Sequence, residues 1–295
     1  MTQLTVLAAA LAAVSQQQAQ VQPEPAVAAR LVIAPAPIAR RVATADAVVT
    51  GKVVSIDDKT VNAVRFPGDT GTGEYKVAVV KIDDPILNAR GLTHVRVGFQ
   101  NVQVGPGAGP IRPGRPRPVT LQKDQEVLLF LQSRPDVDFY TAPAYFDVVD
   151  KNAPTYAADL AEAKRCGSLL AEADKNLKSG NAEDRYLTAA MLLSRYRNPG
   201  FRNPNEAKQE PISAERSKAL LTILAEADWA PQPGRNLLYL NPQNIFQSLG
   251  LTEADGWKPP TNFNTFQDEA RKWLREHKDT YRIKQYVQPK PGEKQ

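Results

Sequence analysis

Alternating apolar and polar positions run through the first half of the chain and predict β-strands. Between Val48 and Ile56 both alternating sets carry apolar side chains, and the β-branched residues favour a strand over a helix. Gly51 in the middle of this strand predicts a bend or a bulge. Further strands are predicted at Tyr75–Ile82, Thr93–Val104, Glu126–Gln132 and Phe139–Val149. Five strands separated by Gly, Pro and Asp turns, with no helical period between them, predict a small closed barrel or a sandwich.

The hydrophobic period changes to that of helices from about Thr155 onward. Asn181, followed by Asp184, predicts the N-cap of one helix, and Ser213 predicts the N-cap of the next. A last helix is predicted from Thr265. The apolar faces of the successive helices are Cys166, Leu169, Leu170, Ala173 and Leu177, then Leu187, Ala190 and Met191, then Leu220, Ile223, Leu224 and Ala227, and finally Phe266, Ala270, Trp273, Leu274 and His277. The second half is therefore predicted to be all-α.

The N-terminal segment carries an export signal by its pattern. Residues 4–14 form an apolar, Ala-rich run of signal-peptide length, followed by a polar stretch with small residues suited to cleavage. The run is too short to span a bilayer. We therefore expect a signal peptide in residues 1–20 and a secreted or periplasmic protein, with an uncleaved anchor or a disordered Ala-rich leader as the alternatives. Residues 21–37 are predicted to be a Pro/Ala-rich linker and residues 288–295 a disordered tail.

The start of the β half resembles a known family. The sequence PIARRVATADAVVTGKVVSI is similar to the entry of the netrin-like, or tissue-inhibitor-of-metalloproteinase-like (TIMP-like), OB-fold barrel, where a short helix leads through an Ala-Asp pair into the first strand. YKVAVVKI and KDQEVLLFLQ are similar to later strands of that family. The resemblance implies an α+β fold with an N-terminal five-stranded OB-like β-barrel in residues 38–150, followed by a C-terminal all-α helical domain in residues 151–287. We expect residues 38–150 to fold without the helical half.

The whole chain is also similar to uncharacterised exported proteins of planctomycete-type bacteria, a resemblance that implies a localisation but no activity. In the inhibitor family an N-terminal cysteine chelates the zinc of the protease. This chain has no cysteine before Cys166, so only the fold carries over. One cysteine and two histidines, His94 and His277, also exclude a disulfide scaffold and make a structural zinc site unexpected.

Charge adds one candidate contact surface. The chain has 37 basic and 32 acidic residues and a formal net charge of +5, which a mixed, solvated surface explains without nucleic acid. Residues 105–121 contain Arg112, Arg115 and Arg117 and no acidic residue. This basic loop is interpreted either as a contact for an anion or partner or as a solvated connection, and it lacks the aromatic residues that stack on bases. The last helix carries a basic flank, which is interpreted either as a contact for anionic lipid or an acidic envelope polymer or as a solvated face.

Candidate catalytic groups are few. Cys166 would be a nucleophile if His277 approached it, but its place in an apolar stripe favours a packed thiol. Paired carboxylates lie at strand ends and in the first turn of a helix, where they suit the helix dipole. These pairs are Asp57-Asp58, Asp83-Asp84 and Glu183-Asp184.

These observations predict an exported, non-catalytic binding or structural module that interacts with an envelope protein or an anionic polymer. No catalytic residue, cofactor or metal site and no further transmembrane segment is expected. The alternative is a hydrolase with its site in the cleft between the barrel and the helical domain. Convergent polar side chains with shifted pKa values in that cleft would indicate the hydrolase, and an exposed apolar patch without them would indicate the binding module.

Overall fold

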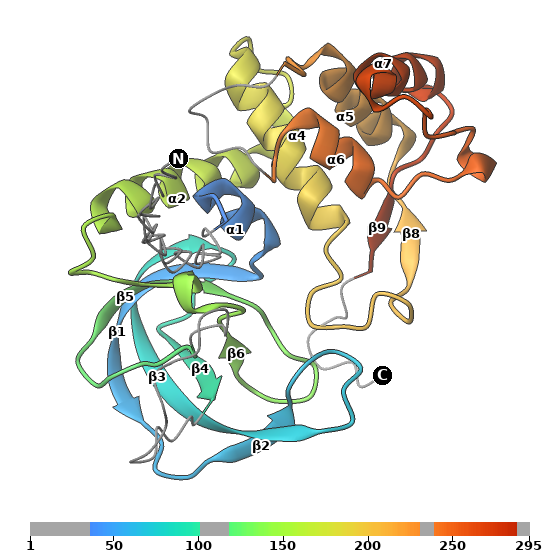
Figure 1. The fold of residues 1–295 in the computed structure, drawn as a ribbon. Helices are drawn as coiled ribbons and strands as arrows, with labels where there is room; N and C mark the ends of the chain where they lie inside the picture. Colours follow the sequence, from blue (N-terminus) through green and yellow to red (C-terminus); the bar gives the residue numbers. More distant parts are fainter. Residues whose placement is uncertain (1–35, 101–117, 231–238, 288–295) are drawn as a thin grey trace, which may run out of the picture.

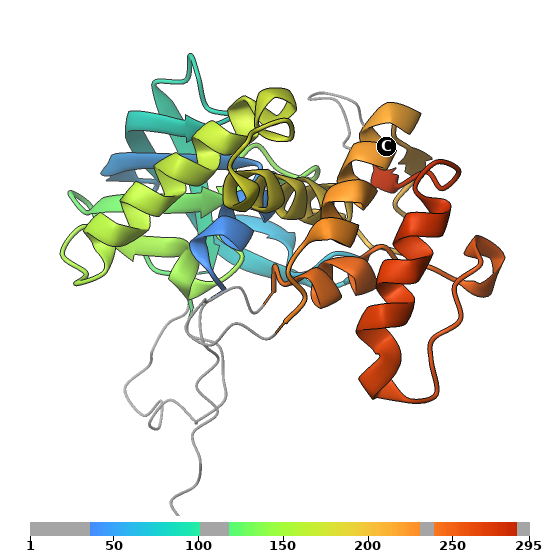
Figure 2. The ribbon, with the colours of Figure 1, turned by 90° about the horizontal axis from the view of Figure 1, so that it is seen from above.

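The structure is a computed structural model that describes residues 36–100, 118–230 and 239–287. These residues form a mixed α+β fold in which a curled sheet is covered on one side by helices (Figure 1). In Figure 2 the sheet and α2 (Tyr156–Ala171) lie at one side, α5 (Ala214–Glu226) and α7 (Phe266–His277) lie at the other, and α4 (Ala182–Tyr196) lies between them. Among the described residues no helix combines the length and the apolar character that crossing a membrane requires.

The sheet has seven strands in the order β6-β4-β3-β1-β5-β7, and β2 pairs with β3 outside this path. The only parallel pair among the named strands is that of β4 with β6. Beyond the end of β5, Gln132 and Thr141 exchange two backbone hydrogen bonds of 2.8 and 2.9 Å, which joins β5 to β6. The strands are β1 (Ala47–Ile56), β2 (Val61–Val64), β3 (Thr72–Leu87), β4 (His94–Gln100), β5 (Glu126–Leu131), β6 (Tyr140–Thr141) and β7 (Val148–Asp150).

Four of the five predicted strands are present, and residues 101–104 of the third lie outside the described residues. The strand β3 begins three residues before and ends five residues after the bounds predicted for it. The register of β1 against β3 shifts between Thr50 and Gly51, so the predicted bulge is present. A Cβ at Gly51 would lie 2.3 Å from the carbonyl oxygen of Lys81, which explains why glycine stands there.

The predicted strand at Phe139–Val149 is wrong as one element. It is divided into β6, a 3₁₀ turn at Tyr145–Asp147 and β7. Pro143 lies at the break, and the Asp147 carboxylate accepts a hydrogen bond from the backbone N–H of Ala144 at 3.0 Å, which stabilises the turn.

The helices follow the predicted caps. Asn181 accepts hydrogen bonds from the backbone N–H groups of Glu183 and Asp184 at the start of α4, and Ser213 accepts one from Arg216 at the start of α5. The first predicted helical face is divided into α2 and the short α3 (Ala173–Asn176). The remaining elements are α1 (Ile38–Thr44), α6 (Pro242–Ser248), two 3₁₀ turns at Glu253–Asp255 and Phe263–Thr265, and the antiparallel pair β8 (Gln209–Pro211) and β9 (Lys284–Tyr286).

The largest apolar core joins the sheet to the helices. Val48, Leu128 and Phe130 point from β1 and β5 into a cluster that also contains Met191 of α4 and Leu220 of α5. The neighbouring residues of the same strands form a second cluster on the other face of the sheet. Both faces of β1 and β5 are therefore buried, which is why both alternating sets are apolar.

A buried ion pair fixes α1 to the sheet. Nε of Arg41 lies 3.0 Å from Oδ1 of Asp147, and the two side chains are only 5% and 7% exposed. The Arg41 guanidinium lies 4.0 Å from the centre of the Phe130 ring. Burial raises the pKa of Asp147 and lowers the pKa of Arg41, because desolvation outweighs the attraction between them.

Candidate functional site

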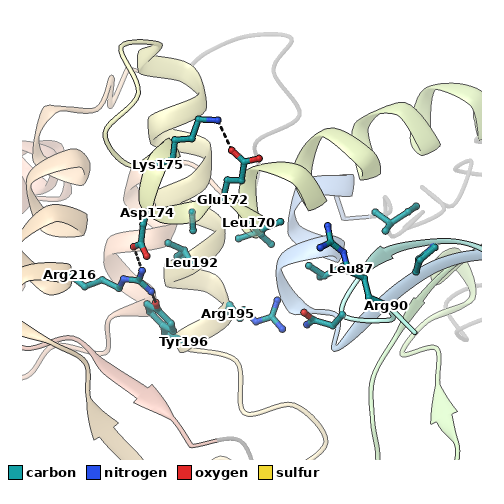
Figure 3. Close-up of a pocket in the computed structure, with 15 residues that line it drawn as sticks. Leu87, Arg90, Leu170, Glu172, Asp174, Lys175, Leu192, Arg195, Tyr196 and Arg216 are labelled. Atoms are coloured by element: carbon teal, nitrogen blue, oxygen red, sulfur yellow. Dashed lines mark hydrogen bonds and ion pairs between the residues drawn. The ribbon is translucent and has the colours of Figure 1, made fainter. Parts of the chain in front are cut away.

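An open groove of about 980 Å³ lies where the end of β3 meets the helices (Figure 3). The end of β3 and the turn after it form one wall, the corner between α2 and α3 together with α4 forms the other, and Arg216 of α5 lies at one end. The groove is thus built from segments that are far apart in the sequence.

Local backbone features shape both walls. Asn88, directly after β3, has a φ of 52°, a left-handed conformation that asparagine tolerates better than most residues. Its side chain donates a hydrogen bond of 3.0 Å to the carbonyl oxygen of Asp46, which holds the turn against β1. On the other wall, a Cβ at Gly167 would lie 2.9 Å from the carbonyl oxygen of Ile86. Glycine therefore lets α2 approach the end of β3 closely.

Several charged groups at the groove already have partners. Arg216 donates to the Asp174 carboxylate and to the Tyr196 hydroxyl oxygen at 3.1 Å, and the latter hydrogen bond is the main reason that its pKa is raised. Nζ of Lys175 lies 2.6 Å from Glu172, and this hydrogen bond lowers the pKa of the Glu172 carboxyl. These groups neutralise one another (Figure 3).

Two arginines at the groove are not neutralised. The side chains of Arg90, exposed in the turn after β3, and of Arg195, half-buried on α4, make no hydrogen bond or ion pair with any described residue. Four cationic side chains line the groove against two carboxylates, so its charge is +2. Sequence reasoning missed both arginines, because a turn arginine and a helix arginine carry no motif that distinguishes them from solvated residues.

The groove does contain polar side chains with shifted pKa values, those of Glu172, Lys175 and Arg216, which is the feature named above as indicating a hydrolase. The main cause of each shift is a hydrogen bond to another residue of the groove, Lys175, Glu172 or Tyr196. None of the described residues that line it is Ser, Thr, Cys or His. The pKa of Glu172 is lowered, which is the opposite of what a general acid at neutral pH requires. Within residues 36–100, 118–230 and 239–287, no three His, Cys, Asp or Glu residues are grouped so that they could hold a metal ion.

Cys166 and His277 are not brought together. Cys166 is fully buried on α2, as predicted, its Sγ lies 3.5 Å from Oε1 of Glu162, and burial raises the pKa of its thiol. His277, at the end of α7, stacks on Trp273 with ring centres 4.7 Å apart. Its Nδ1 lies 3.0 Å from the backbone oxygen of Trp273. In Figure 1 α2 and α7 lie on opposite sides of the helical layer.

The other candidates have ordinary environments. His94 is exposed on β4, and its Nδ1 lies 3.0 Å from the hydroxyl oxygen of Thr93. At least one carboxylate of each predicted pair is bound to a cation: Asp57 to Arg96, Asp84 to Lys164, and both Glu183 and Asp184 to Arg165. The apolar face of α7 is buried in the core. Arg112, Arg115 and Arg117 lie outside the described residues.

A second, smaller hollow of about 250 Å³ lies between the β2–β3 turn and the segment after α4. Arg134 lies beside it with its side chain fully buried, ion-paired to Asp136 at 2.7 Å and stacked 4.1 Å from the Phe201 ring centre. Phe201 belongs to the helical half, so this arginine connects the two halves of the molecule. Comparisons of the chain with protein-family models, with curated proteins and with solved structures find no match.

Proposed function

We propose that this protein is an exported, non-catalytic binding module that holds an anionic envelope protein or polymer in the groove between the sheet and the helices. The observation that carries the proposal is the pair of unpartnered arginines, Arg90 and Arg195, on opposite walls of a concave surface. A half-buried guanidinium without a partner is less stable than a paired one, and a bound carboxylate or phosphate would supply the missing charge-assisted hydrogen bonds.

We further propose that the curled sheet is an OB-type barrel of the netrin-like kind. The strand order β1-β3-β4-β6-β5 is that of a Greek-key arrangement, and the Gln132–Thr141 bridge brings β6 back to the end of β5. The residues that follow would then form the helical part of the module. The described groove residues include no Ser, Thr, Cys or His, and the two carboxylates among them, Glu172 and Asp174, are already paired with cations, which counts against the hydrolase alternative.

Export is the part of the proposal that rests on residues 1–20. The apolar run at residues 4–14 and the small residues after it support cleavage between about Ser15 and Val21. N-terminal sequencing of protein recovered outside the cytoplasm is expected to begin in that interval. An intact Met1 on exported protein would contradict cleavage.

Binding is tested with fluorescent anionic probes: polyphosphate, poly-glutamate and short acidic peptides. We expect at least one probe to bind the wild-type protein, more weakly at high salt. The Arg90→Glu/Arg195→Glu variant should bind about tenfold more weakly or not at all. Arg282→Glu is the matched control, because Arg282 is exposed, has no ion pair among the described residues and lies outside the groove. The proposal is wrong if no probe binds, or if the double variant binds every probe as tightly as wild type.

A further inference from the structure

The aliphatic side chains and the two unpaired arginines of the groove indicate which class of anionic ligand it binds. Resting on the function proposed above, we propose that the groove binds an extended segment of a partner protein in which apolar and acidic side chains alternate, rather than a polyanionic polymer.

The floor of the groove is aliphatic. Ile86 and Leu87 at the end of β3, Leu170 at the end of α2 and Leu192 of α4 all line it. Ile86 and Leu170 are only partly buried by the rest of the chain, so they keep apolar surface that a ligand can cover. A polyphosphate has no apolar surface to place there, whereas leucine- or valine-like side chains of a peptide would be removed from water.

The charge is located at the sides of this floor. Arg90 is in the turn at the end of one wall, and Arg195 is on the helix that forms the other. Successive side chains of an extended peptide point to opposite faces. Apolar side chains directed to the floor therefore place the intervening side chains toward the rim, where carboxylates can meet the two arginines.

The carboxylates of the groove indicate where acidic residues of the ligand peptide are disfavoured. Asp174, held by Arg216, and Glu172, held by Lys175, lie together on the α3 side. Because each carboxylate is paired with its cation, this part of the groove has no net positive charge to attract a further ligand carboxylate. We therefore expect acidic residues to be favoured near Arg90 and Arg195 and disfavoured beside α3.

The test compares the affinities of different peptides for the same wild-type protein, so that a change in protein stability cannot cause the difference. The reference probe is a short labelled peptide that alternates leucine and glutamate, measured with the full chain by fluorescence anisotropy. A peptide with serine in place of leucine and one with glutamine in place of glutamate should each bind about tenfold more weakly. Arg195→Glu should weaken the reference peptide by a similar factor, and Arg282→Glu should leave it unchanged.

The outcomes separate this inference from the proposed function. Polyphosphate, poly-glutamate or the serine peptide binding as tightly as the reference peptide, with the same loss in Arg195→Glu, would overturn the peptide inference and leave the anion-binding function in place. Failure of every anionic probe, or binding that Arg90→Glu/Arg195→Glu does not weaken, would overturn both. Equal binding of the glutamine and glutamate peptides would also overturn the inference, since the arginines would then not be used.

Discussion

At the scale of single residues, burial determines the pKa of several ionisable side chains and what they contribute to stability. Arg41 and Asp147 are both buried, so their attraction competes with the loss of hydration of two charges. The sequence offered no signal for this pair, because its members are distant in the chain and lie in an ordinary helix and an ordinary turn. The burial of Cys166, in contrast, followed directly from the helical spacing of its apolar neighbours.

Replacing Arg41 with Met should lower the free energy of unfolding by about 3–5 kcal/mol at pH 7, because Asp147 is then buried without its cation. The pKa of Asp147 is already raised in the folded protein, and the loss of Arg41 raises it further. A raised folded-state pKa means that stability is lost as the pH rises through it and is kept below the unfolded value. The deficit of Arg41→Met should therefore shrink as the pH falls toward 4.

The control for this prediction is the double variant Arg41→Met/Asp147→Asn, measured by urea unfolding across the same pH range. It has no charge to bury, so its difference from Arg41→Met should be largest at neutral pH. A deficit in Arg41→Met that does not change with pH would show that lost packing, and not the unpaired carboxylate, causes the destabilisation.

Cys166 should be nearly unreactive in the folded protein, because burial raises the pKa of its thiol and blocks access to it. A thiol reagent at neutral pH should label native protein slowly and denatured protein quickly. Cys166→Ala should cost about 1–2 kcal/mol of stability, a packing effect. Fast native labelling that disappears in His277→Gln would contradict the separation of the two residues seen in the structure.

At the scale of elements, the sequence predicted those features that depend on residues close together in the chain. The caps at Asn181 and Ser213 and the bulge at Gly51 were all recognisable, because each depends on neighbours in the chain or on the special geometry of glycine. The short strands β2, β8 and β9 were not recognised. Each is three or four residues long, too short to show an alternating pattern. The strand β2 pairs with the start of β3 across a turn, and β8 and β9 pair with each other although they are far apart in the sequence.

Asn181→Ala should lower the free energy of unfolding by about 0.5–2 kcal/mol, because two backbone N–H groups at the start of α4 lose their acceptor. Thr155→Ala is the matched control, since Thr155 precedes α2 but its side chain makes no capping hydrogen bond. The control should change stability by less than about 0.5 kcal/mol in thermal or chemical unfolding. Equal losses in the two variants would mean that the capping hydrogen bond contributes little.

At the scale of the whole molecule, the composition and period of the chain predicted a β half followed by an all-α half, and the structure is a mixed α+β fold. The second half is not all-α, because it contains the antiparallel pair β8 and β9. The groove could not be predicted, since its walls come from the end of β3, from α2 to α4 and from α5. The packing of the sheet against the helices could not be predicted from the sequence either. Apolar residues on both faces of β1 are compatible with a closed barrel alone, whereas here one face packs against helices.

The shared core changes the expectation for an isolated β half. Val48, Leu128 and Phe130 lose their helical neighbours when the chain ends at residue 150, and a large apolar surface is then exposed. We expect residues 36–150 to show no cooperative thermal transition by circular dichroism. The full chain should unfold in one transition that includes both halves. A cooperative melt of the fragment, with a β-type spectrum, would restore the independent barrel predicted from the sequence.

The position of α1 has a consequence for the order of events during synthesis. This helix is the first described element to leave the ribosome, yet it packs against α2 and α4, which are made more than a hundred residues later. Its buried side chains, Ala39, Val42 and Ala43, therefore have no complete surface to dock on until α4 has emerged. Folding of the N-terminal end must wait for the C-terminal half. Such a delay keeps the chain unfolded for longer, which would suit passage through a translocation pore if the protein is exported as proposed above.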